Sequence, residues 1–353
     1  MRRRSMSTRF RLIAISPVVA LAAGHLGCLA HSRPAATGAT PPAAVATAPF
    51  TVLDWDGHKG AVSFTFDDAQ PSHVEHYAEL QAAGVPMTFY INSGKPAFDD
   101  FDAAWTRAAR DGHELGNHTT HHCHAGAGAN ISGCIMGAAL ADAGAEIEDN
   151  AAYITAHYPQ SAVWTMASPF GDNGWSQPAR TRVFLNRGVQ SGMIAPYDHT
   201  DPFNLPVHLV ATGETAARFD DATDRARAGG KWVIFLFHTL TPTGANWYAP
   251  VATADVTSAM RHARSLGDVW VDTVANVGAY WRGQQILAAA PSSATGAATT
   301  WTWTLPAHFP AGKSLRVTLR DGGTLAQNGQ PLARGAQGDY RVALDAGTLT
   351  FTH

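Results

Sequence analysis

The sequence predicts an α/β fold built on parallel strands, followed by a small antiparallel β domain. Three observations support this expectation. Between residues 61 and 281, short β-branched and aromatic runs alternate with longer helical segments, the pattern of strands joined by crossovers. Two of these runs, 61–66 and 231–237, stop directly before ionisable side chains, and such strand ends face the ligand crevice. After residue 300, apolar and polar residues alternate between Gly and Asp turns. The alternation alone allows either a closed barrel or an open doubly wound sheet.

The individual elements follow from local signals. Strands are expected at 61–66, 87–91, 162–166, 189–195, 206–212 and 231–237. Helices are expected at 72–83, 98–110, 137–157, 178–186, 215–228, 253–266 and 273–281. Ser72 is a suitable N-cap, Gly84 a helix stop, and Pro159 ends the long Ala-rich helix. The four runs expected to form the antiparallel domain are 301–304, 314–319, 340–344 and 348–352.

Composition limits the function classes. The chain has 353 residues, of which 45% are hydrophobic and 15% charged, enough for one sizeable core and a satellite domain. The formal net charge is −3 and no basic stripe is apparent, which argues against nucleic acid and acidic membranes as partners. The 17 histidines cluster in part, which favours a metal site.

The chain divides into five expected segments. They are a signal peptide (1–30), an Ala/Pro/Thr-rich linker (31–59), the α/β domain (60–285), a second linker (286–299) and a small β accessory domain (300–353).

The first segment predicts export to the periplasm or the medium. Five arginines precede an apolar run at 12–23, which has the length of a signal peptide and is too short to span a membrane. Cleavage after Ala30 is favoured over lipoprotein anchoring at Cys28, because His25 stands where a lipoprotein box normally has Leu. No integral membrane span is expected after removal of the signal.

Asp67 and Asp68 end the first strand of the α/β domain. Neighbouring strand residues point to opposite faces, so one carboxylate can bind a cation while the other accepts a proton. The alternative is a solvated turn, because Asp is common after strands.

His118 and His122 are four residues apart in a His-rich stretch. On one helical turn or tight loop this spacing places both imidazoles within reach of one ion. A zinc site completed by Asp68 would leave positions open for water and substrate, as catalytic zinc does. An exposed His-rich patch is the alternative.

Cys123 adjoins this pair and is a competing ligand. A disulfide between Cys123 and Cys134 is favoured over ligation, because an exported protein meets an oxidising compartment. His238 ends the strand at 231–237 and is either a buried structural residue or an acid/base group at the mouth of the sheet.

Taken together, these motifs resemble the polysaccharide deacetylase family, carbohydrate esterase family 4. Thr65-Phe66-Asp67-Asp68, His118-Thr119-x-x-His122 and Leu236-x-His238 occur in the order typical of that family, and the resemblance covers about residues 61–282. It implies a distorted (β/α) barrel that hydrolyses acetyl groups of sugar polymers with a divalent metal, zinc first, with cobalt or another divalent ion as alternatives.

The resemblance also implies roles for individual residues. Asp67 would be the general base, and Asp68, His118 and His122 the metal ligands. His238 would be the general acid, and the backbone N–H of Phe170 would bind the oxyanion.

Two family motifs are imperfect in this sequence. The arginine that pairs with the base is replaced by Ala167, so that another cation must serve Asp67 or the base is tuned differently. The motif supplying a partner for His238 is only partly present, which leaves Asp198, Asp201 and Asp272 as candidates.

The sequence therefore predicts a metal-dependent hydrolase that removes acetyl groups from a polysaccharide or oligosaccharide, with N-acetyl slightly favoured over O-acetyl. The alternatives are a non-catalytic carbohydrate-binding relative and a metal-dependent amidohydrolase for a small molecule.

Overall fold

The computed structural model describes residues 48–94, 101–242 and 248–353. The expected signal peptide at 1–30, the lipoprotein alternative at Cys28 and most of the first expected linker (31–47) lie outside these residues. Within the described part of the chain, no helix combines the length and apolarity that crossing a membrane requires.

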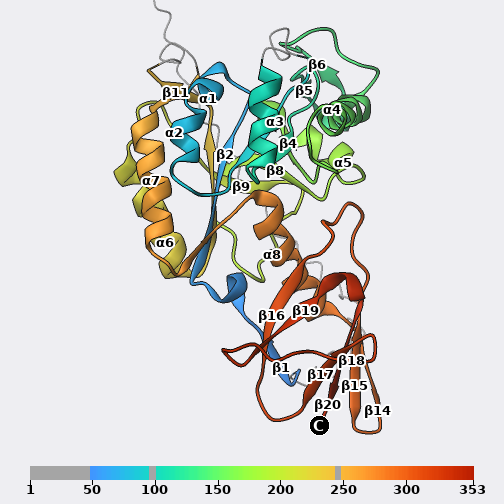
Figure 1. Ribbon diagram of the computed structural model, residues 1–353. Coiled ribbons are helices and arrows are strands. Elements are labelled where there is room, and N and C mark those ends of the chain that lie inside the picture. Colours follow the sequence, from blue (N-terminus) through green and yellow to red (C-terminus); the bar gives the residue numbers. More distant parts are fainter. Residues whose placement is uncertain (1–47, 95–100, 243–247) are drawn as a thin grey trace, which may run out of the picture. The chain divides into compact units, whose positions relative to one another are not determined.

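A closed parallel barrel forms the larger part of the fold (Figure 1), which confirms the predicted distorted (β/α) barrel. The sheet order is β10-β9-β8-β7-β4-β3-β2-β13, and pairing of β10 with β2 closes a ring of seven strands. β13 pairs with the first residues of β2, whereas β3 pairs with its last residues. The strands are β2 (Gly60–Phe66), β3 (Thr88–Ile91), β4 (Glu114–Asn117), β7 (Thr165–Ala167), β8 (Leu185–Ser191), β9 (Leu205–Leu209), β10 (Trp232–Phe237) and β13 (Val269–Val271).

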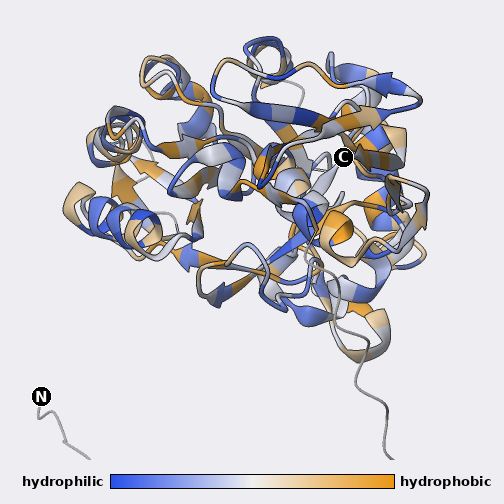
Figure 2. Ribbon diagram, turned by 90° about the horizontal axis from the view of Figure 1, so that it is seen from below, coloured by the Kyte–Doolittle hydropathy of each residue, from blue (hydrophilic) through white to orange (hydrophobic). Residues whose placement is uncertain are grey.

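Two apolar clusters bury both faces of β10, which explains its uninterrupted hydrophobic sequence. One face packs Phe235 and Phe237 with helices outside the barrel, and the other packs Trp232 and Leu236 with α8. Along the outer helices, hydrophobic and hydrophilic residues interchange (Figure 2), as expected where one helix face packs on a sheet. The helices are α1 (Pro71–Glu75), α2 (Tyr77–Gln81), α3 (Asp102–Arg110), α4 (Ala143–His157), α5 (Ser176–Ala179), α6 (Ala216–Gly229), α7 (Thr253–Ser265) and α8 (Val274–Ala289).

Several helix predictions need correction. The helix expected at 72–83 is two short helices that meet at His76, and Gln70 rather than Ser72 occupies its N-cap position. The helix expected from 137 begins only at Ala143, because the Asp142 side chain caps it by accepting from Ala145 N.

The helix expected at 178–186 was wrong over most of its length. Only α5, which ends at Ala179, is helical there, and β8 begins at Leu185. β8 fills the place between β7 and β9, so that burial in the sheet outweighs the local helical preference.

The C-terminal residues form two antiparallel sheets, as the fold prediction stated. One has the order β1-β16-β19 and the other β14-β15-β20-β17-β18. The strands are β1 (Phe50–Val52), β14 (Ser292–Thr295), β15 (Ala298–Thr302), β16 (Ser314–Leu319), β17 (Thr324–Gln327), β18 (Gln330–Pro331), β19 (Asp339–Ala343) and β20 (Thr348–Thr352). Two small sheets elsewhere pair β5 (His124–Ala125) with β6 (Ile131–Ser132) and β11 (Thr239–Thr241) with β12 (Pro250–Ala252).

Parts of both expected linkers are regular structure. Residues 286–299 contain the end of α8 and the β14–β15 hairpin, and residues 50–52 form β1 on β16. Cross-strand pairs in the hairpin, such as Ala294 with Thr299 and Thr295 with Ala298, offset the low apolar content that suggested a linker.

Candidate metal centre

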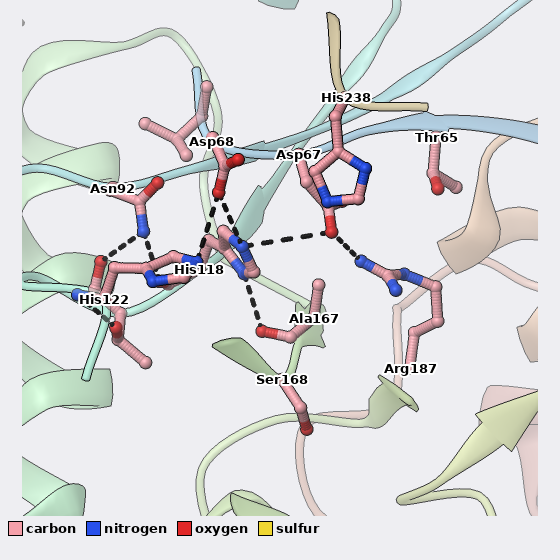
Figure 3. A network of polar contacts seen from close by, with 12 residues as sticks. Thr65, Asp67, Asp68, Asn92, His118, His122, Ala167, Ser168, Arg187 and His238 are labelled. Atoms are coloured by element: carbon pink, nitrogen blue, oxygen red, sulfur yellow. Dashed lines mark hydrogen bonds and ion pairs between the residues drawn. The ribbon is translucent and has the colours of Figure 1, made fainter. Parts of the chain in front are cut away.

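Three neighbouring strand ends place the candidate site. β2 ends before Asp67 and Asp68, β4 before His118, and β10 before His238. The in-register pairing of Phe237 with Phe66 brings the ends of β10 and β2 together, and Asp67 N donates to Phe237 O at 3.0 Å. The side chains therefore converge at the carboxyl ends of the parallel strands (Figure 3).

Asp68, His118 and His122 form a compact group of metal-ligand type. Nε2 of His118 and Nε2 of His122 each lie 3.2 Å from Oδ1 of Asp68, and all three ligand atoms lie within 4.8 Å of one another. Ligand atoms of a tetrahedral zinc with bonds of about 2 Å are separated by roughly 3.3 Å. The donor set and spacing therefore fit a divalent cation.

Strained backbone in two turns helps to direct these ligands. Asp68 has φ +71° and His122 has φ +49°, both in the left-handed region that side-chain-bearing residues rarely adopt. Nδ1 of His118 donates to Ala167 O at 2.9 Å, which leaves Nε2 as the lone-pair nitrogen facing the candidate ion position. Ala167 thus contributes a backbone carbonyl at the place where a family arginine was expected.

Charges within the group favour ionised Asp68. Burial alone would raise the pKa of Asp68, but hydrogen bonds and charge interactions with His118 and His122 outweigh it and hold that pKa well below its ordinary value. Burial likewise opposes protonation of His118, yet Asp67 and Asp68 together raise the pKa of His118. A cation at this position would replace the protons that these three side chains attract.

Arg187 of β8 forms an ion pair with Asp67 and supplies the cation that the sequence analysis found missing. Arg187 is fully buried, its guanidinium lies 5.2 Å from the centre of the Tyr90 ring, and its Nη1 donates to Gly188 O at 2.8 Å. Oδ2 of Asp67 lies 3.9 Å from His118 Nε2, so Asp67 is beside the metal ligands (Figure 3).

Sequence reasoning missed Arg187 because its surroundings were assigned in part to a helix. The available signal was an arginine between Asn186 and Gly188, in a segment that the barrel needs as a strand.

His238 lies at the pocket wall, but none of its three expected partners reaches it. Asp198 accepts from the backbone N–H groups of Ala195 and Thr200. Asp201 pairs with Arg180, and Asp272 accepts from residues of its own turn and of α8. These local turn and surface interactions hold all three carboxylates elsewhere, which overturns the expectation.

His238 lies between the Tyr248 ring and the charged groups of the site. Its ring lies 4.6 Å from the Tyr248 ring, and its Nδ1 makes no hydrogen bond within the described part of the chain. Burial lowers the pKa of His238, partly opposed by the negative charges of Asp67 and Asp68. Its backbone carbonyl accepts a hydrogen bond from Nε2 of buried His73, and burial lowers the pKa of His73 to about 4.

Phe170 lies beside the ligand His122 on the loop after β7. Its ring is 4.4 Å from the His122 ring and stacks on His124 at 3.6 Å. Phe170 has φ +55° and its side chain is 42% exposed. The participation of its backbone N–H in oxyanion binding stays a prediction.

Cys123 and Cys134 are joined in a disulfide, so neither offers a free thiolate to a metal. Buried Glu146 of α4 holds the same loop: its carboxylate accepts from His121 N at 2.8 Å and from Leu140 N at 2.9 Å. Both links fasten the segment that carries His118 and His122.

These groups line a pocket of about 470 Å³. It is bounded by Asp67, Asp68, His118, His122, Ile135, Ser168, Phe170, Gly171, Val189, Leu209, His238 and Tyr248.

Residues 55–183 match the sequence model of the family described as polysaccharide deacetylase. Over this stretch, the chain is similar to the polysaccharide deacetylase family. The match includes Asp67, Asp68, His118 and His122, whereas Arg187 and His238 lie beyond it. Among proteins with curated descriptions, none matches the chain.

Solved structures of several family members are similar to part of this chain. A family 4 acetyl xylan esterase from Clostridium thermocellum, in complex with a cobalt ion, is 16% identical, with a TM-score of 0.39 over 62% of this chain and 89% of the other. A family 4 carbohydrate esterase from Streptomyces lividans, in complex with acetate, is 15% identical, with a TM-score of 0.40 over 62% and 94%. A pseudoenzyme of the same family from Bacillus anthracis is 14% identical, with a TM-score of 0.40 over 62% and 65%.

Proposed function

We propose that this protein is a metal-dependent hydrolase that removes N-acetyl or O-acetyl groups from a polysaccharide or oligosaccharide. The observation that carries the proposal is the convergence of Asp68, His118 and His122 beside Asp67, whose carboxylate pairs with buried Arg187. Similarity to this family supports the acetyl class of substrate. In this ion pair, Arg187 takes the place of the family arginine that is absent at Ala167. That absence was the only feature of the sequence that suggested a non-catalytic relative.

Asp68, His118 and His122 would hold the cation, with zinc as our first choice. A divalent ion bound there supplies Lewis acidity toward the acetyl carbonyl and toward a water molecule. The carboxylate and imidazole donors suit zinc and also accept other divalent ions.

The chain's own residues would divide the proton transfers. Asp67 accepts the proton of the attacking water, and Arg187 orients its carboxylate. His238, which lines the same pocket, donates a proton to the leaving amine or alkoxide. The Phe170 N–H donates to the developing oxyanion.

Acetate release tests the proposal directly. The substrates are chitin oligomers, peptidoglycan and acetylated xylan, each assayed with the zinc-loaded protein, with chelator, and after zinc is restored. We expect release from at least one substrate, its loss with chelator and its recovery with zinc. Release that is unaffected by complete metal removal, or no release from any substrate by zinc-loaded protein, contradicts the proposal.

Site variants separate the assigned roles. Asp67→Asn should retain bound zinc while turnover falls by about two orders of magnitude or more, as for a lost general base. His118→Ala should lose both zinc and turnover. His157→Ala is the matched control, because this exposed histidine at the end of α4 lies outside the pocket. Metal content by elemental analysis and acetate release are measured together. Wild-type turnover in Asp67→Asn, or full zinc content in His118→Ala, would show the roles to be misassigned.

We also propose that the protein is exported to the periplasm or the medium. The Cys123–Cys134 disulfide supports an oxidising compartment. Fractionation of the producing cells, followed by mass spectrometry of the mature N-terminus, tests export and distinguishes cleavage after Ala30 from lipidation at Cys28.

A further inference from the structure

Exposed apolar side chains gather around the candidate metal centre. Five large hydrophobic side chains are exposed among the described residues: Ile135, Phe170, Tyr197, Leu209 and Tyr248. All except Tyr197 line the pocket that contains Asp67 and the metal-ligand group. Scattered exposed apolar residues are ordinary, but their concentration at one concave site indicates an apolar ligand group.

Most of these side chains come from one side of the barrel. Phe170 follows β7, Val189 lies on β8, Leu209 ends β9 and Tyr248 follows β10, and these four strands are consecutive in the sheet. The metal-ligand group instead follows β2 and β4. The pocket therefore has a polar centre and an apolar wall, which we define as Ile135, Phe170, Val189, Leu209 and Tyr248.

The wall offers few partners to a sugar ring. Outside Asp67, His238 and the ligand group, the hydrogen-bonding side chains among the described lining residues are Ser168 and Tyr248. Ser168 is buried and already bonded to Asn186. His124 covers one face of the Phe170 ring, which leaves the exposed Tyr248 ring as the aromatic surface of the wall for stacking on a sugar. Sugar hydroxyls placed against this wall would lose their hydrogen bonds to water without replacement.

The pocket is also large for an acetyl group. Its volume of about 470 Å³ is roughly fifteen times the volume that one water molecule occupies in liquid water. A two-carbon acyl group would leave most of the apolar wall in contact with water.

We propose that this site accepts an aliphatic acyl group longer than acetyl, of butanoyl to octanoyl length, with the chain lying along the apolar wall. The inference deepens the proposed function and rests on it: the same groups cleave the same ester or amide bond, and the substrate class becomes medium-chain acylated saccharides.

The test compares 4-nitrophenyl acetate, butanoate and hexanoate with the zinc-loaded protein, so that the leaving group is constant. We expect kcat/KM to rise with chain length, by up to about threefold for each added methylene that becomes buried. Calorimetric titration of the zinc-loaded protein with acetate and hexanoate measures the same preference without turnover, and hexanoate should bind more tightly.

Variants locate the preference. Leu209→Ser and Ile135→Ser should lower the hexanoate-to-acetate ratio of kcat/KM at least about fivefold, because each removes apolar contact with the chain. Tyr197→Ser is the matched control: it removes an exposed aromatic side chain outside the pocket and should leave the ratio unchanged. Circular dichroism confirms that each variant is folded.

The outcomes separate the two proposals. Suppose that the acetate ester is hydrolysed with zinc, but kcat/KM stays constant or falls with chain length, or acetate and hexanoate bind equally well. Either result overturns the long-acyl inference and leaves the proposed hydrolase intact. Absence of zinc-dependent hydrolysis at every chain length overturns the inference, and the proposed function falls with it if the acetylated saccharides also release no acetate. If kcat/KM rises with chain length but no wall variant changes the hexanoate-to-acetate ratio, the acyl chain lies elsewhere and the inference is also overturned.

Discussion

Asp67 and Arg187 are 120 residues apart in sequence and form a buried ion pair beside the candidate metal position. Removing one partner of such a pair leaves an uncompensated charge, which costs about 3–5 kcal/mol in other proteins. The arginine also fixes the position of the carboxylate that would act as general base. Arg187 therefore affects both stability and the proposed proton transfer.

Replacing Arg187→Met should lower the free energy of unfolding by about 3 kcal/mol or more and also lower turnover, because Asp67 loses the partner that orients its carboxylate. Urea unfolding and acetate release measure the two effects. Arg180→Met breaks the half-exposed pair with Asp201 and is the control, with an expected cost below about 1 kcal/mol.

The double variant Asp67→Asn/Arg187→Met distinguishes the two roles of Arg187. It should recover part of the lost stability, because no buried carboxylate is left unpaired, but no activity. An Arg187→Met protein with wild-type stability and wild-type turnover would argue against both roles.

His113 gives a separate prediction at the residue scale. Its Nδ1 accepts from Met87 N at 3.1 Å and its Nε2 donates to Gln81 Oε1 at 2.6 Å, an arrangement that requires the neutral ring. Burial lowers the pKa of His113 from the ordinary 6.5 to about 4. Because the folded pKa lies below the unfolded one, the stability contribution of His113 is complete above pH 6.5 and is lost as pH falls toward 4.

Between pH 7 and pH 5, His113 should account for a loss of about 2 kcal/mol in the free energy of unfolding. The variant His113→Gln lacks this titration, so its unfolding free energy should fall by correspondingly less over the same interval. Urea unfolding at both pH values measures the difference. Parallel losses in the two proteins would exclude the linkage.

At the element scale, α4 holds the ligand loop through its first turn. Glu146 is fully buried there and accepts from the backbone of His121 and Leu140, on either side of the disulfide-closed segment. These hydrogen bonds anchor the loop to α4, a helix of 15 residues.

Glu146→Gln should destabilise the protein by about 1–3 kcal/mol, because the amide NH₂ then faces backbone donors. Looser ligands should also weaken zinc binding about tenfold, the lower end of the range for residues that support ligands indirectly. Glu148→Gln is the control on the same helix, since Glu148 is exposed and pairs with Arg182. Thermal unfolding and competitive zinc titration are the measurements, and equal behaviour of the two variants would contradict the role of Glu146.

Element identity was predictable where burial and periodicity agreed. β2 and β10 are buried along their whole length and appear in the sequence as uninterrupted strand-like runs. β8 was misassigned in part because Asn186 and Arg187 interrupt its apolar pattern. Both side chains form hydrogen bonds with residues of other elements, Asn186 with Ser168 and Arg187 with Asp67. The local sequence contains neither of these partners.

At the scale of residues 48–353, the C-terminal sheets share a core with the barrel's last helix. Tyr280 and Leu287 of α8 belong to the same apolar cluster as Leu315 and Leu344, and β1 pairs with β16. A Cβ added at Gly283 would lie 2.6 Å from Leu344 Cδ1, so the helix and the β domain approach closely. The β domain therefore contributes to the stability of the barrel.

Removal of residues 290–353 should lower the melting temperature well below that of the intact chain, because Tyr280 and Leu287 become exposed and β1 loses its partner. Deletion of the exposed His353 alone is the control. Scanning calorimetry measures both, and a truncated protein that melts at the intact chain's temperature would show that the two parts are energetically independent.

The sequence by itself determined the alternating α/β order, the carboxylates at the end of β2 and the histidine pair after β4. These features reside in contiguous residues, where strand alternation and i, i+4 spacing fix which side chains lie together. Only the tertiary structure decided that Arg187 pairs with Asp67, that three aspartates lie away from His238, and that apolar side chains of β8, β9 and nearby loops surround the site. Those contacts depend on barrel closure and strand register, which no local spacing in the chain encodes.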